Sequence, residues 1–468
     1  MVEIVFNRRD AIKVTGAGAL ASQLPKSSAA AEVPFETNQA MTRGYIAHFV
    51  QTPTRRFVPK DETQAQKALA TLRDTGSDFA IQSSGHCFSG FSQHKDALID
   101  MRAMRGISID RTNNLVRFAA GTTIGDLNRA MSAAKKATPV GTCHTVAMSG
   151  LVTLGGYGIM TRLHGVACDS LVAARIITAN GQIRQIDGDS DPDLFWALKG
   201  GGAGSFGLLT ELTMRTYDAA KPQSVIFRIA GDPKTMVDWL SGATEIIQET
   251  KDRADFYFRK EPISTSGRIQ NYEFQVTHIN NPDLLNTLTQ KFARLGSLRS
   301  APEVYADNLR QMTDPLYPKG YPVVPFQIGH RYLKAVPKSA EWVALFERVI
   351  EHQNRQAGLN IRFLGGAVDD LPRDAAAYPH RGNFATVQAY ALWRKDEALE
   401  PARKIINTLL GTLRRTIAPG QYANYTDRTL VDYADAYWAE NYPRLQQVKA
   451  AYDPEDVFHY PHSVRLPA

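Results

Sequence analysis

The segment SSGHCFSG, which begins at Ser83, places small residues and an imidazole directly after a short apolar stretch, FAIQ. Ser83, Ser84 and Gly85 carry little side-chain bulk, so we expect their backbone N–H groups to be accessible where the strand turns into a loop. A concave set of backbone donors suits a pyrophosphate group. His86 follows at once and would hold its imidazole over the bound group. Taken alone, His86 would more often be a histidine hydrogen-bonded within the turn.

A second segment, GTCHTVAMSGLVTLGGYGIMTRLHG, holds Cys143 just after a turn at residues 139–141 and among several glycines. By itself, Cys143 would be an inert buried thiol. The chain has three cysteines, the others being Cys87 and Cys168, so at least one is not in a disulfide with another. The sequence has no CxxC or HExxH spacing, so we expect no metal centre.

The segment GGGAGSFG carries Gly202, Gly204 and Gly207 in the G-x-G-x-x-G spacing of a dinucleotide fingerprint. That fingerprint must follow a strand and open a helix. Here the helical pattern DLFWALK precedes the glycines and the strand pattern FGLLTELTMRTY follows them. The spacing therefore indicates tight turns and close backbone approach rather than a Rossmann site.

The elements that must position these loops form two differently patterned regions. Up to Asp218, short strands and helices alternate, with a hairpin turn at Asn180 and Gly181, which predicts one α+β unit. From residue 219 to 419, strands with period-two alternation (SVIFRIA, DFYFRK, NYEFQVTHI, FATVQAYALW) are separated by long amphipathic helices. This pattern predicts an antiparallel sheet with helices on one side and a solvated or ligand-facing surface on the other. We expect domains at residues 32–218 and 219–419, followed by an aromatic-rich segment at 420–468.

Composition limits the classes of partner. Of 468 residues, 43% are hydrophobic and 22% charged, which is ordinary for a soluble globular protein with a large core. The net charge is +7, and the first 31 residues contribute four basic and two acidic side chains, which leaves +5 for the rest. We see no dense Lys/Arg run interleaved with aromatics, so nucleic acid is not an expected partner. The sequence contains no uninterrupted apolar stretch of about 18 residues, so we expect no membrane span.

The N-terminus has the order of an export signal: NRRDAIK is charged, VTGAGALASQL is weakly apolar, and SSAAAE offers small residues for cleavage. The pair Arg8 and Arg9 resembles a twin-arginine signal of bacteria. We therefore expect residues 1–31 to be removed near Ala31 and the mature chain to reach the periplasm or the exterior. The alternative is an irregular cytosolic N-terminal helix.

Six separated motifs together resemble the berberine-bridge-enzyme-like oxidoreductases, within the vanillyl-alcohol-oxidase type of FAD-binding fold. The motifs, in the family's order, are G-H-x-x-x-G at Gly85, His86 and Gly90; G-x-C-x-x-V at Gly141, Cys143 and Val146; DLFWALKGGGAGSFG; GGA…YPHRG; ANYTD; and KAAYDPEDVF. The resemblance covers nearly the whole chain after residue 31. It implies an α+β, two-domain PCMH-type FAD-binding fold, a substrate domain built on an antiparallel sheet backed by helices, and a C-terminal segment that returns to the FAD domain.

The resemblance also implies covalently bound FAD. In bicovalent members the matching histidine bonds to the flavin 8α-methyl group and the matching cysteine to ring carbon C6, so His86 and Cys143 are assigned these roles. Such links would fix the ring and make it a better oxidant. The further cofactor contacts that we expect are Ser83, Ser84, Gly85, Ser89, Val146, Gly150, Gly155, Gly156 and Asn424.

Three side chains are candidates for catalysis. Tyr425, in ANYTD, matches the family tyrosine that takes the substrate hydroxyl proton. The alternative is a purely structural role, as a buried tyrosine hydrogen-bonded to the backbone. A phenol with a pKa of about 10 is a weak base at neutral pH unless its surroundings help. Asp370 falls where relatives keep an acidic residue facing the ring, and we expect it to accept the phenol's hydrogen bond, with Asp369 as the fallback. Gln388 matches a family active-site glutamine, although strand glutamines often pair within the sheet.

Two positions depart from the family pattern. Ser84 replaces a glycine that usually precedes the histidine, so the loop there could sit differently. His164, in TRLHG, stands where relatives often place an aromatic residue near the substrate. The sequence gives equal support to two roles for His164. It could contact the substrate, or it could be a packed residue that supports the site.

The resemblance implies hydride transfer from an alcohol or lactol carbon of a sugar, aromatic alcohol or natural product to the flavin. Relatives with valine at the position of Val146 tend to be oxidases, so O₂ would be reduced to hydrogen peroxide. One alternative is a dehydrogenase that passes electrons to a quinone or cytochrome, and another is a flavin-carrying protein without activity. The sequence does not predict the oligomeric state.

Overall fold

The computed structural model describes residues 49, 51–250, 253–260, 270–306, 309, 326–352, 357–392 and 399–468, which all belong to one compact unit, Val33–Ala468. The expected export signal, residues 1–31, lies outside the described residues. Among the described helices, none has the length and apolar character needed to cross a membrane.

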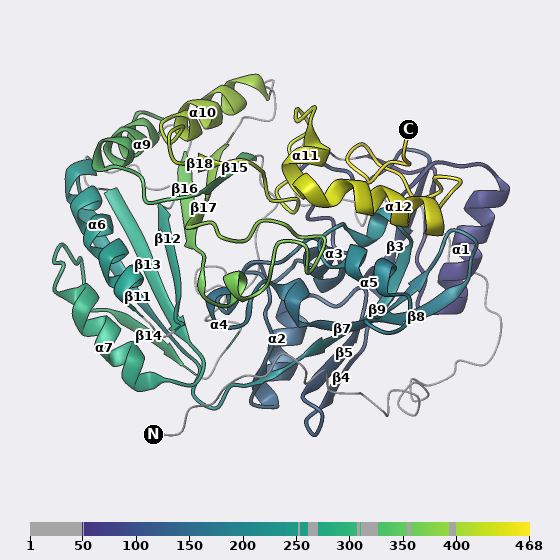
Figure 1. Ribbon diagram of the computed structural model, residues 1–468, viewed down its shortest axis with the longest axis horizontal. Coiled ribbons are helices and arrows are strands. Elements are labelled where there is room, and N and C mark those ends of the chain that lie inside the picture. Colours follow the sequence, from purple (N-terminus) through teal and green to yellow (C-terminus); the bar gives the residue numbers. More distant parts are fainter. Residues whose placement is uncertain are drawn as a thin grey trace. The chain divides into compact units, whose positions relative to one another are not determined.

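The first region of the chain contains two sheets and a short ribbon (Figure 1). The strands are β1 (Arg55–Phe57), β2 (Phe79–Gln82), β3 (Ala97–Asp100), β4 (Ile107–Asp110), β5 (Leu115–Ala119), β6 (Lys136–Ala137), β7 (Leu171–Ile177), β8 (Ile183–Asp187), β9 (Leu208–Arg215) and β10 (Tyr217–Asp218). A parallel sheet has the order β1-β3-β2, and an antiparallel sheet has the order β4-β5-β9-β7-β8. Strands β6 and β10 pair with each other.

Helices of this region begin at polar caps and bury one apolar stripe. They are α1 (Glu62–Asp74), α2 (Ile124–Ala133), α3 (Met148–Thr153), α4 (Thr161–His164) and α5 (Pro192–Leu198). Asp61 caps α1 by accepting the N–H of Gln64, and Thr123 caps α2 by accepting the N–H of Asp126. The predicted hairpin is β7–β8, and Gly181 takes the left-handed φ of 80° that its turn requires. The glycines of GGGAGSFG lie between helix α5 and strand β9, as the sequence indicated.

The second region is one eight-stranded sheet, with the order β14-β11-β13-β12-β16-β17-β15-β18. Its strands are β11 (Gln223–Gly231), β12 (Asp255–Lys260), β13 (Gln270–His278), β14 (Glu303–Ala306), β15 (Phe326–Leu333), β16 (Gly358–Phe363), β17 (Ala385–Leu392) and β18 (Ile417–Ala418). All the pairings between neighbouring strands are antiparallel. These strands fall within the range expected for the substrate domain, and the exact domain boundaries stay predictions.

Helices cover one face of this sheet (Figure 1): α6 (Pro233–Glu249), α7 (Pro282–Ala293), α9 (Ser339–Glu351) and α10 (Glu400–Gly411). In β12, Phe256 and Phe258 are fully buried in the core on this helical side. Burying one such aromatic side chain stabilises the fold by about 2–3 kcal/mol. Because neighbouring residues of a strand point to opposite faces, Tyr257 and Arg259 lie on the other, polar face.

The polar face carries a cross-strand row that positions the candidate site. The register pairs Tyr257 of β12 with Arg362 of β16, and Arg362 with Thr386 of β17. A second row pairs Asn360 with Gln388 in the same two neighbouring strands, β16 and β17. The alternation in these strands therefore places polar side chains on the face opposite the helices.

The C-terminal segment lies against the first region through helices α11 (Tyr433–Trp438) and α12 (Tyr442–Tyr452). The indole N–H of Trp438 donates to the carbonyl of Gly200 at 3.0 Å. The fully buried Lys449 donates to the carbonyl of Ser205 at 3.0 Å and pairs with Asp453 at 2.5 Å. These bonds join the end of the chain to the glycine-rich loop after α5.

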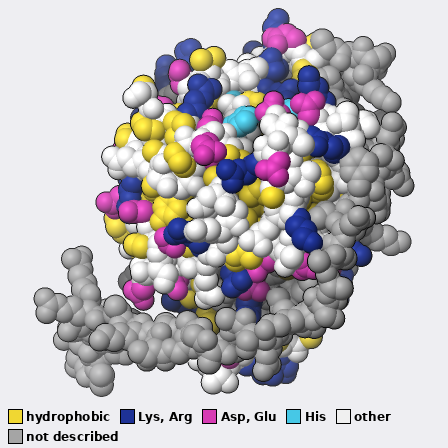
Figure 2. All heavy atoms as spheres, turned by 90° about the vertical axis from the view of Figure 1, so that its right-hand side faces the viewer, with side chains coloured by type: hydrophobic (Ala, Val, Ile, Leu, Met, Phe, Trp, Pro, Cys, Tyr) yellow, Lys and Arg dark blue, Asp and Glu magenta, His cyan; other side chains and the backbone are white. Residues whose placement is uncertain are grey.

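The described surface mixes charges. On the face drawn in Figure 2, basic and acidic side chains are interspersed with apolar and uncharged ones, and the described atoms there form no continuous basic stripe.

Gly158 offers a sharp test of the packing beside the site. A Cβ added there would lie 1.7 Å from the carbonyl oxygen of Val140, so the backbone would have to move. We expect Gly158→Ala to lower the free energy of unfolding by about 2–3 kcal/mol, the cost typical of overpacking. Thermal denaturation should show a lower Tm than for Gly188→Ala, whose added Cβ meets no atom within 4 Å. Equal Tm values for the two variants would contradict this packing.

Candidate active site

A small pocket lies at the polar face of the eight-stranded sheet, where loops of the first region and the ANYTD segment approach it. It is lined by Thr142, Tyr157, Tyr257, Asn360, Arg362, Thr386, Gln388 and Tyr425. Three parts of the chain that are distant in sequence therefore share one site.

His86 and Cys143 lie on two loops that are hydrogen-bonded to each other. His86 Nε2 lies 2.8 Å from the hydroxyl of Thr145, two residues beyond Cys143. The hydroxyl of Ser84 accepts the backbone N–H of Ala147 at 2.9 Å. His86 is half-buried, and desolvation lowers its pKa to about 4, so its imidazole is neutral at pH 7. A neutral imidazole has the lone pair that a bond to carbon requires.

The three cysteines occupy different surroundings. Cys143 is half-buried, and its carbonyl accepts the N–H of Val146 at 3.1 Å in a tight turn. Cys168 is fully buried, which raises the pKa of its thiol and leaves it unreactive. Cys87 Sγ lies 3.7 Å from the hydroxyl of Thr426. Cys143 is thus the thiol on the loop that bonds to the loop of His86.

Tyr425 lies beside this pair of loops. Its ring packs edge-on against Phe88 at 5.7 Å and lies 5.5 Å from the ring of His330. Burial raises the pKa of Tyr425, the negative charge of a Cys143 thiolate raises it further, and the positive charge of Arg362 opposes both. Tyr425 is therefore a protonated phenol at neutral pH, with a cation as its favourable neighbour.

The ANYTD segment is held by its own side chains. Asn424 donates to the carbonyl of Leu151 at 3.0 Å and to the hydroxyl of Tyr422 at 2.9 Å. The hydroxyl of Thr426 accepts the N–H of Ser89 at 3.1 Å. These bonds connect Tyr425 to both the α3 helix and the His86 loop. Asn424 and Ser89 were both expected to contact the cofactor. In this structure they form hydrogen bonds within the protein.

Asp370 does not lie where the sequence reasoning placed it. Its exposed carboxylate forms a two-pronged ion pair with Arg253, at 2.6 and 2.8 Å. The fallback, Asp369, is also exposed and accepts the N–H of Gly382 at 2.8 Å. The prediction that Asp370 supports Tyr425 is wrong for this structure, because the segment Gly366–Asp370 forms a 3₁₀ turn whose acidic end faces solvent.

Gln388 combines the two roles that the sequence left open. Its Oε1 accepts the amide of Asn360 on the neighbouring strand at 2.8 Å, so it pairs within the sheet. It also lines the pocket with Tyr425. Since Oε1 is engaged, the amide Nε2 is the group available to donate to a bound oxygen.

The glycines expected at the cofactor have different surroundings. Gly156 donates to the hydroxyl of Tyr422 at 2.7 Å, and a Cβ added to it would lie 2.5 Å from Ala167. Gly155 likewise donates within the protein, to the carbonyl of Val152 at 3.1 Å. The N–H groups of both glycines are therefore engaged within the protein, and the expectation that these residues contact the cofactor stays a prediction. Gly150 is exposed, with open space where a Cβ would be, which leaves room for a ligand.

The remaining expected contacts lie at the loops themselves. Gly85 has a φ of 79°, which lets the chain turn just before His86. Ser83 is half-buried in the same turn. Val146 is half-buried, and its carbonyl accepts the N–H of Ile124 at 2.9 Å. The half-buried His86 and Cys143, with open space at Gly150, fit a flavin nucleotide bound along these loops.

His164 is a packed residue in this structure. Its ring stacks on Tyr217, with centroids 3.5 Å apart and an interplanar angle of 14°. Burial lowers its pKa to about 4, and the charges of His278 and Arg253 add to the effect. Of the two readings of His164, the geometry favours the supporting role.

The sequence reasoning missed most of the residues that the sheet contributes to the pocket, Arg362 above all. Arg362 lies in the strand NIRF, where the buried neighbours Ile361 and Phe363 flank it. That alternation was the available signal, but the strand had not been identified. The ring of Tyr257, on the neighbouring strand, lies 4.5 Å from the guanidinium carbon of Arg362.

Buried histidines around the site predict acid sensitivity of the fold. Desolvation lowers the pKa of His380 to about 3 and that of His462 to about 4, both below the unfolded value of about 6.5. The unfolded chain therefore binds more protons between about pH 4 and 6.5, and stability is complete above this window and falls as pH drops through it. Each such histidine contributes about 1.4 kcal/mol per pH unit there.

Melting curves at pH 7.5, 6 and 5 should show this fall in Tm. His380→Gln should make Tm depend less on pH than it does in the wild type. A pH dependence of Tm that is identical in the two proteins would contradict the assignment.

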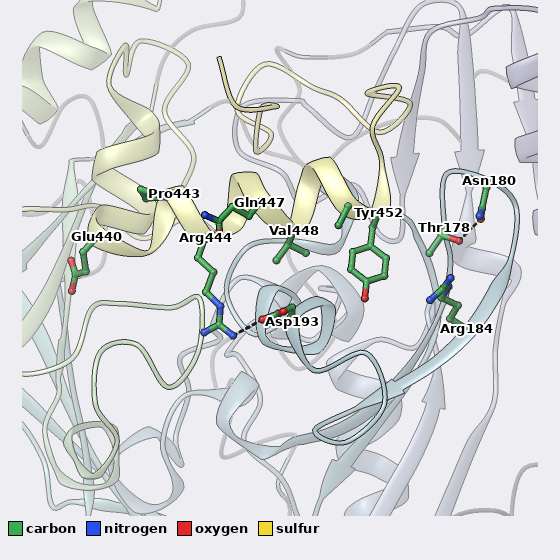
Figure 3. A pocket seen from close by; sticks show the side chains of 11 residues that line it. Thr178, Asn180, Arg184, Asp193, Glu440, Pro443, Arg444, Gln447, Val448 and Tyr452 are labelled. Atoms are coloured by element: carbon green, nitrogen blue, oxygen red, sulfur yellow. Dashed lines mark hydrogen bonds and ion pairs between the residues drawn. The ribbon is translucent and has the colours of Figure 1, made fainter.

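A larger pocket, of about 750 Å³, lies elsewhere, between α12, α5 and the β7–β8 hairpin (Figure 3). Its charged groups are paired: Arg444 with Asp193 at 2.6 Å, and Arg184 with Asp191 at 2.9 Å. Its lining includes none of the residues expected to bind the cofactor or to take part in catalysis. The smaller pocket, which collects Tyr425, Gln388 and the loop of Cys143, is the candidate active site.

Comparisons with known proteins agree with this geometry. Residues 53–187 match a family model described as FAD binding domain, and residues 421–465 match one described as Berberine and berberine like. The chain is 27% identical to Berberine bridge enzyme-like 23 of Arabidopsis thaliana over 451 residues, covering 88% of this chain and 84% of that protein. It is also 27% identical to an aclacinomycin oxidase of Streptomyces galilaeus, covering 91% and 88%. The chain is an FAD-linked oxidoreductase, and it resembles the berberine bridge enzyme-like proteins in sequence.

Solved structures show the same fold. The chain matches Physcomitrella patens BBE-like 1 with a TM-score of 0.83 at 21% identity, covering 93% of this chain and 97% of that one. Berberine bridge enzyme from Eschscholzia californica matches with a TM-score of 0.79 at 20% identity, covering 89% and 90%. The expected α+β fold with an antiparallel substrate-domain sheet is confirmed.

Proposed function

We propose that this protein holds FAD through two covalent bonds, from His86 to the flavin 8α-methyl group and from Cys143 to ring carbon C6. The main observation behind this proposal is that the loops of these two residues are hydrogen-bonded to each other. His86 bonds to Thr145, and Ser84 bonds to Ala147. The neutral state of His86 favours its role as a nucleophile, and the half-buried Cys143 remains within reach of a ligand. Tyr425 lies close enough to Cys143 for the thiolate charge to act on its pKa.

The proposed reaction is oxidation of an alcohol or lactol. Bound FAD supplies the hydride acceptor, at N5 of its ring. Tyr425 reacts as its phenolate, the minor form at neutral pH, and takes the proton of the substrate hydroxyl. Gln388 orients the same oxygen through its amide Nε2. Arg362 supplies the positive charge that stabilises the phenolate of Tyr425, the supporting role that Asp370 does not fill.

We propose that O₂ is the electron acceptor and hydrogen peroxide the product. Val146 supports this by the family pattern, and relatives of the same fold are described as chitooligosaccharide oxidase and aclacinomycin oxidase. The alternative is a dehydrogenase, since a glycine-to-alanine variant of berberine bridge enzyme is described as a reticuline dehydrogenase. Mixing anaerobically reduced protein with air separates the two. Rapid return of the flavin absorbance is expected, and slow return would favour the dehydrogenase.

A peroxide assay over a panel of sugars and aromatic alcohols tests the activity itself. At least one member should yield peroxide with the wild-type protein and far less with Tyr425→Phe. If all members were inert, with flavin still bound, the chain would be a flavin carrier rather than an oxidase.

We also propose that residues 1–31 direct export. Replacing Arg8 and Arg9 together by lysine should retain the protein in the cytoplasm of a bacterial host. Fractionation that finds the variant exported as efficiently as the wild type would overturn this proposal.

A further inference from the structure

The two terminal nitrogens of the Arg362 guanidinium differ in their contacts. Its side chain is 5% exposed. Nη1 donates to the carbonyl of Gly158 at 2.9 Å and pairs with a carboxylate oxygen of Asp255. Nη2 is buried and has no hydrogen-bond partner within the described part of the chain. A buried N–H without a partner is unfavourable, which indicates that something else accepts from it.

The charges around Arg362 do not balance. Arg162 is also buried, and its charge acts on the same carboxylate, Asp255. Arg162 also feels the charge of Asp369, but that carboxylate is exposed, so Asp255 is the buried carboxylate that the two guanidinium groups share. The burial that raises the pKa of Asp255 weakens its compensation of these charges further. Buried cations in excess of their counter-ions favour an additional anion.

The pocket that Arg362 lines is rich in donors. Gln388 presents its amide Nε2, because Asn360 occupies its Oε1. Thr142 and Thr386 add hydroxyl groups, and Tyr425 is protonated at neutral pH. None of the eight residues that line this pocket is acidic. Such a lining suits a ligand that carries oxygen acceptors and negative charge.

We propose that Arg362 binds a carboxylate of the substrate, so that the protein prefers alcohols or lactols that carry a carboxylate close to the reacting carbon. This specificity rests on the proposed oxidase function and deepens it. Arginine is the side chain whose planar fork matches a carboxylate. Binding of the carboxylate by Arg362 would place the substrate hydroxyl at Tyr425, because Arg362 and Tyr425 line the same small pocket.

The competing arrangement lies within the protein. Asp255 Oδ1 also has no hydrogen-bond partner among the described residues, so Nη2 could turn to it and close a two-pronged ion pair. In that case Arg362 would be purely structural, and a carboxylate on the substrate would bring no advantage.

Matched substrates separate these arrangements in the flavin-loaded enzyme. We would measure kcat/KM for galacturonate against galactose, and for 4-(hydroxymethyl)benzoate against 4-methylbenzyl alcohol. In at least one pair, the carboxylated member should exceed its neutral partner by about 100-fold, since a site built for a polar group rejects its analogue strongly. Arg362→Gln should abolish that preference, and Arg362→Lys should keep part of it.

Arg228→Gln is the matched control, because Arg228 lies on the same polar face but pairs with Glu273 and Glu303 outside the pocket. It should leave the preference unchanged. Flavin content and Tm of each variant show whether it folds.

Binding of benzoate gives a readout that does not depend on turnover. Titration of the oxidised holoenzyme should shift the flavin absorbance and saturate, and Arg362→Gln should weaken binding at least tenfold. Oxidation of neutral alcohols with no preference for carboxylates and no benzoate binding would overturn the proposal while the oxidase function stands. Benzoate binding that requires Arg362, in a protein that oxidises no member of the panel, would support the anion site and overturn the proposed function.

Discussion

We expect Tyr425→Phe to lower kcat by about 10²–10⁴-fold, the range typical of losing a positioned proton acceptor. The flavin content should stay unchanged. Tyr425 packs beside the Cys143 loop, and the contacts that the structure shows for Tyr425 include no hydrogen bond from its hydroxyl to that loop. Stopped-flow reduction of the flavin by substrate measures the effect directly. The substitution removes only the hydroxyl, so the edge-on contact with Phe88 and the neighbouring ring of His330 are retained.

The pH dependence provides the control for this prediction. Burial raises the pKa of Tyr425, so the phenol stays protonated through neutral pH and the phenolate fraction grows as the solution becomes more basic. The rate of flavin reduction should therefore rise with pH above 7 in the wild type and lose this rise in Tyr425→Phe. A variant that retains both the rate and the pH profile would remove Tyr425 from the reaction.

We expect that replacing both His86 and Cys143 by alanine releases the flavin from the denatured chain, and that either single substitution leaves the flavin attached through the other residue. Each lost link should also lower the reduction potential of the flavin, since its ring is tuned by its substituents. A fall of about 30 mV in a two-electron potential corresponds to roughly a tenfold change in equilibrium constant. Flavin reduction by substrate should therefore slow stepwise from wild type to single to double variant.

Cys168→Ala is the matched control for the cysteine. Its thiol is buried and its pKa raised, so its removal should change packing but not flavin attachment. Acid-stable flavin in the double variant, or its loss in Cys168→Ala, would contradict the assignment of the two links.

Local pattern accounted for much of the fold. The hairpin at Gly181 and the strands of SVIFRIA and DFYFRK follow from periodicity and turn residues that act over a few positions. The strands β15 and β16 were not identified, although NIRF alternates as clearly as the others. For each strand that was identified, the sequence also predicted which side chains face the helices. Period-two alternation places the apolar residues on one face of the strand and the polar residues on the other.

The candidate site was predictable where motifs carry it and not where long-range pairing does. His86, Cys143 and Tyr425 were found by motif, and the structure brings their segments together. Asp370 failed because its partner, Arg253, is 117 positions away, and nothing local shows that pair. Arg362 was missed for the same reason, since its place beside Tyr425 depends on the register of three strands.

The proposed covalent attachment of the flavin is tested most directly by the mass of the purified protein after acid precipitation and thorough washing. We predict one FAD per chain still attached, and a proteolytic product in which the flavin joins the peptide of His86 to the peptide of Cys143. A polypeptide of unmodified mass, with all of the flavin in the supernatant, would contradict the account.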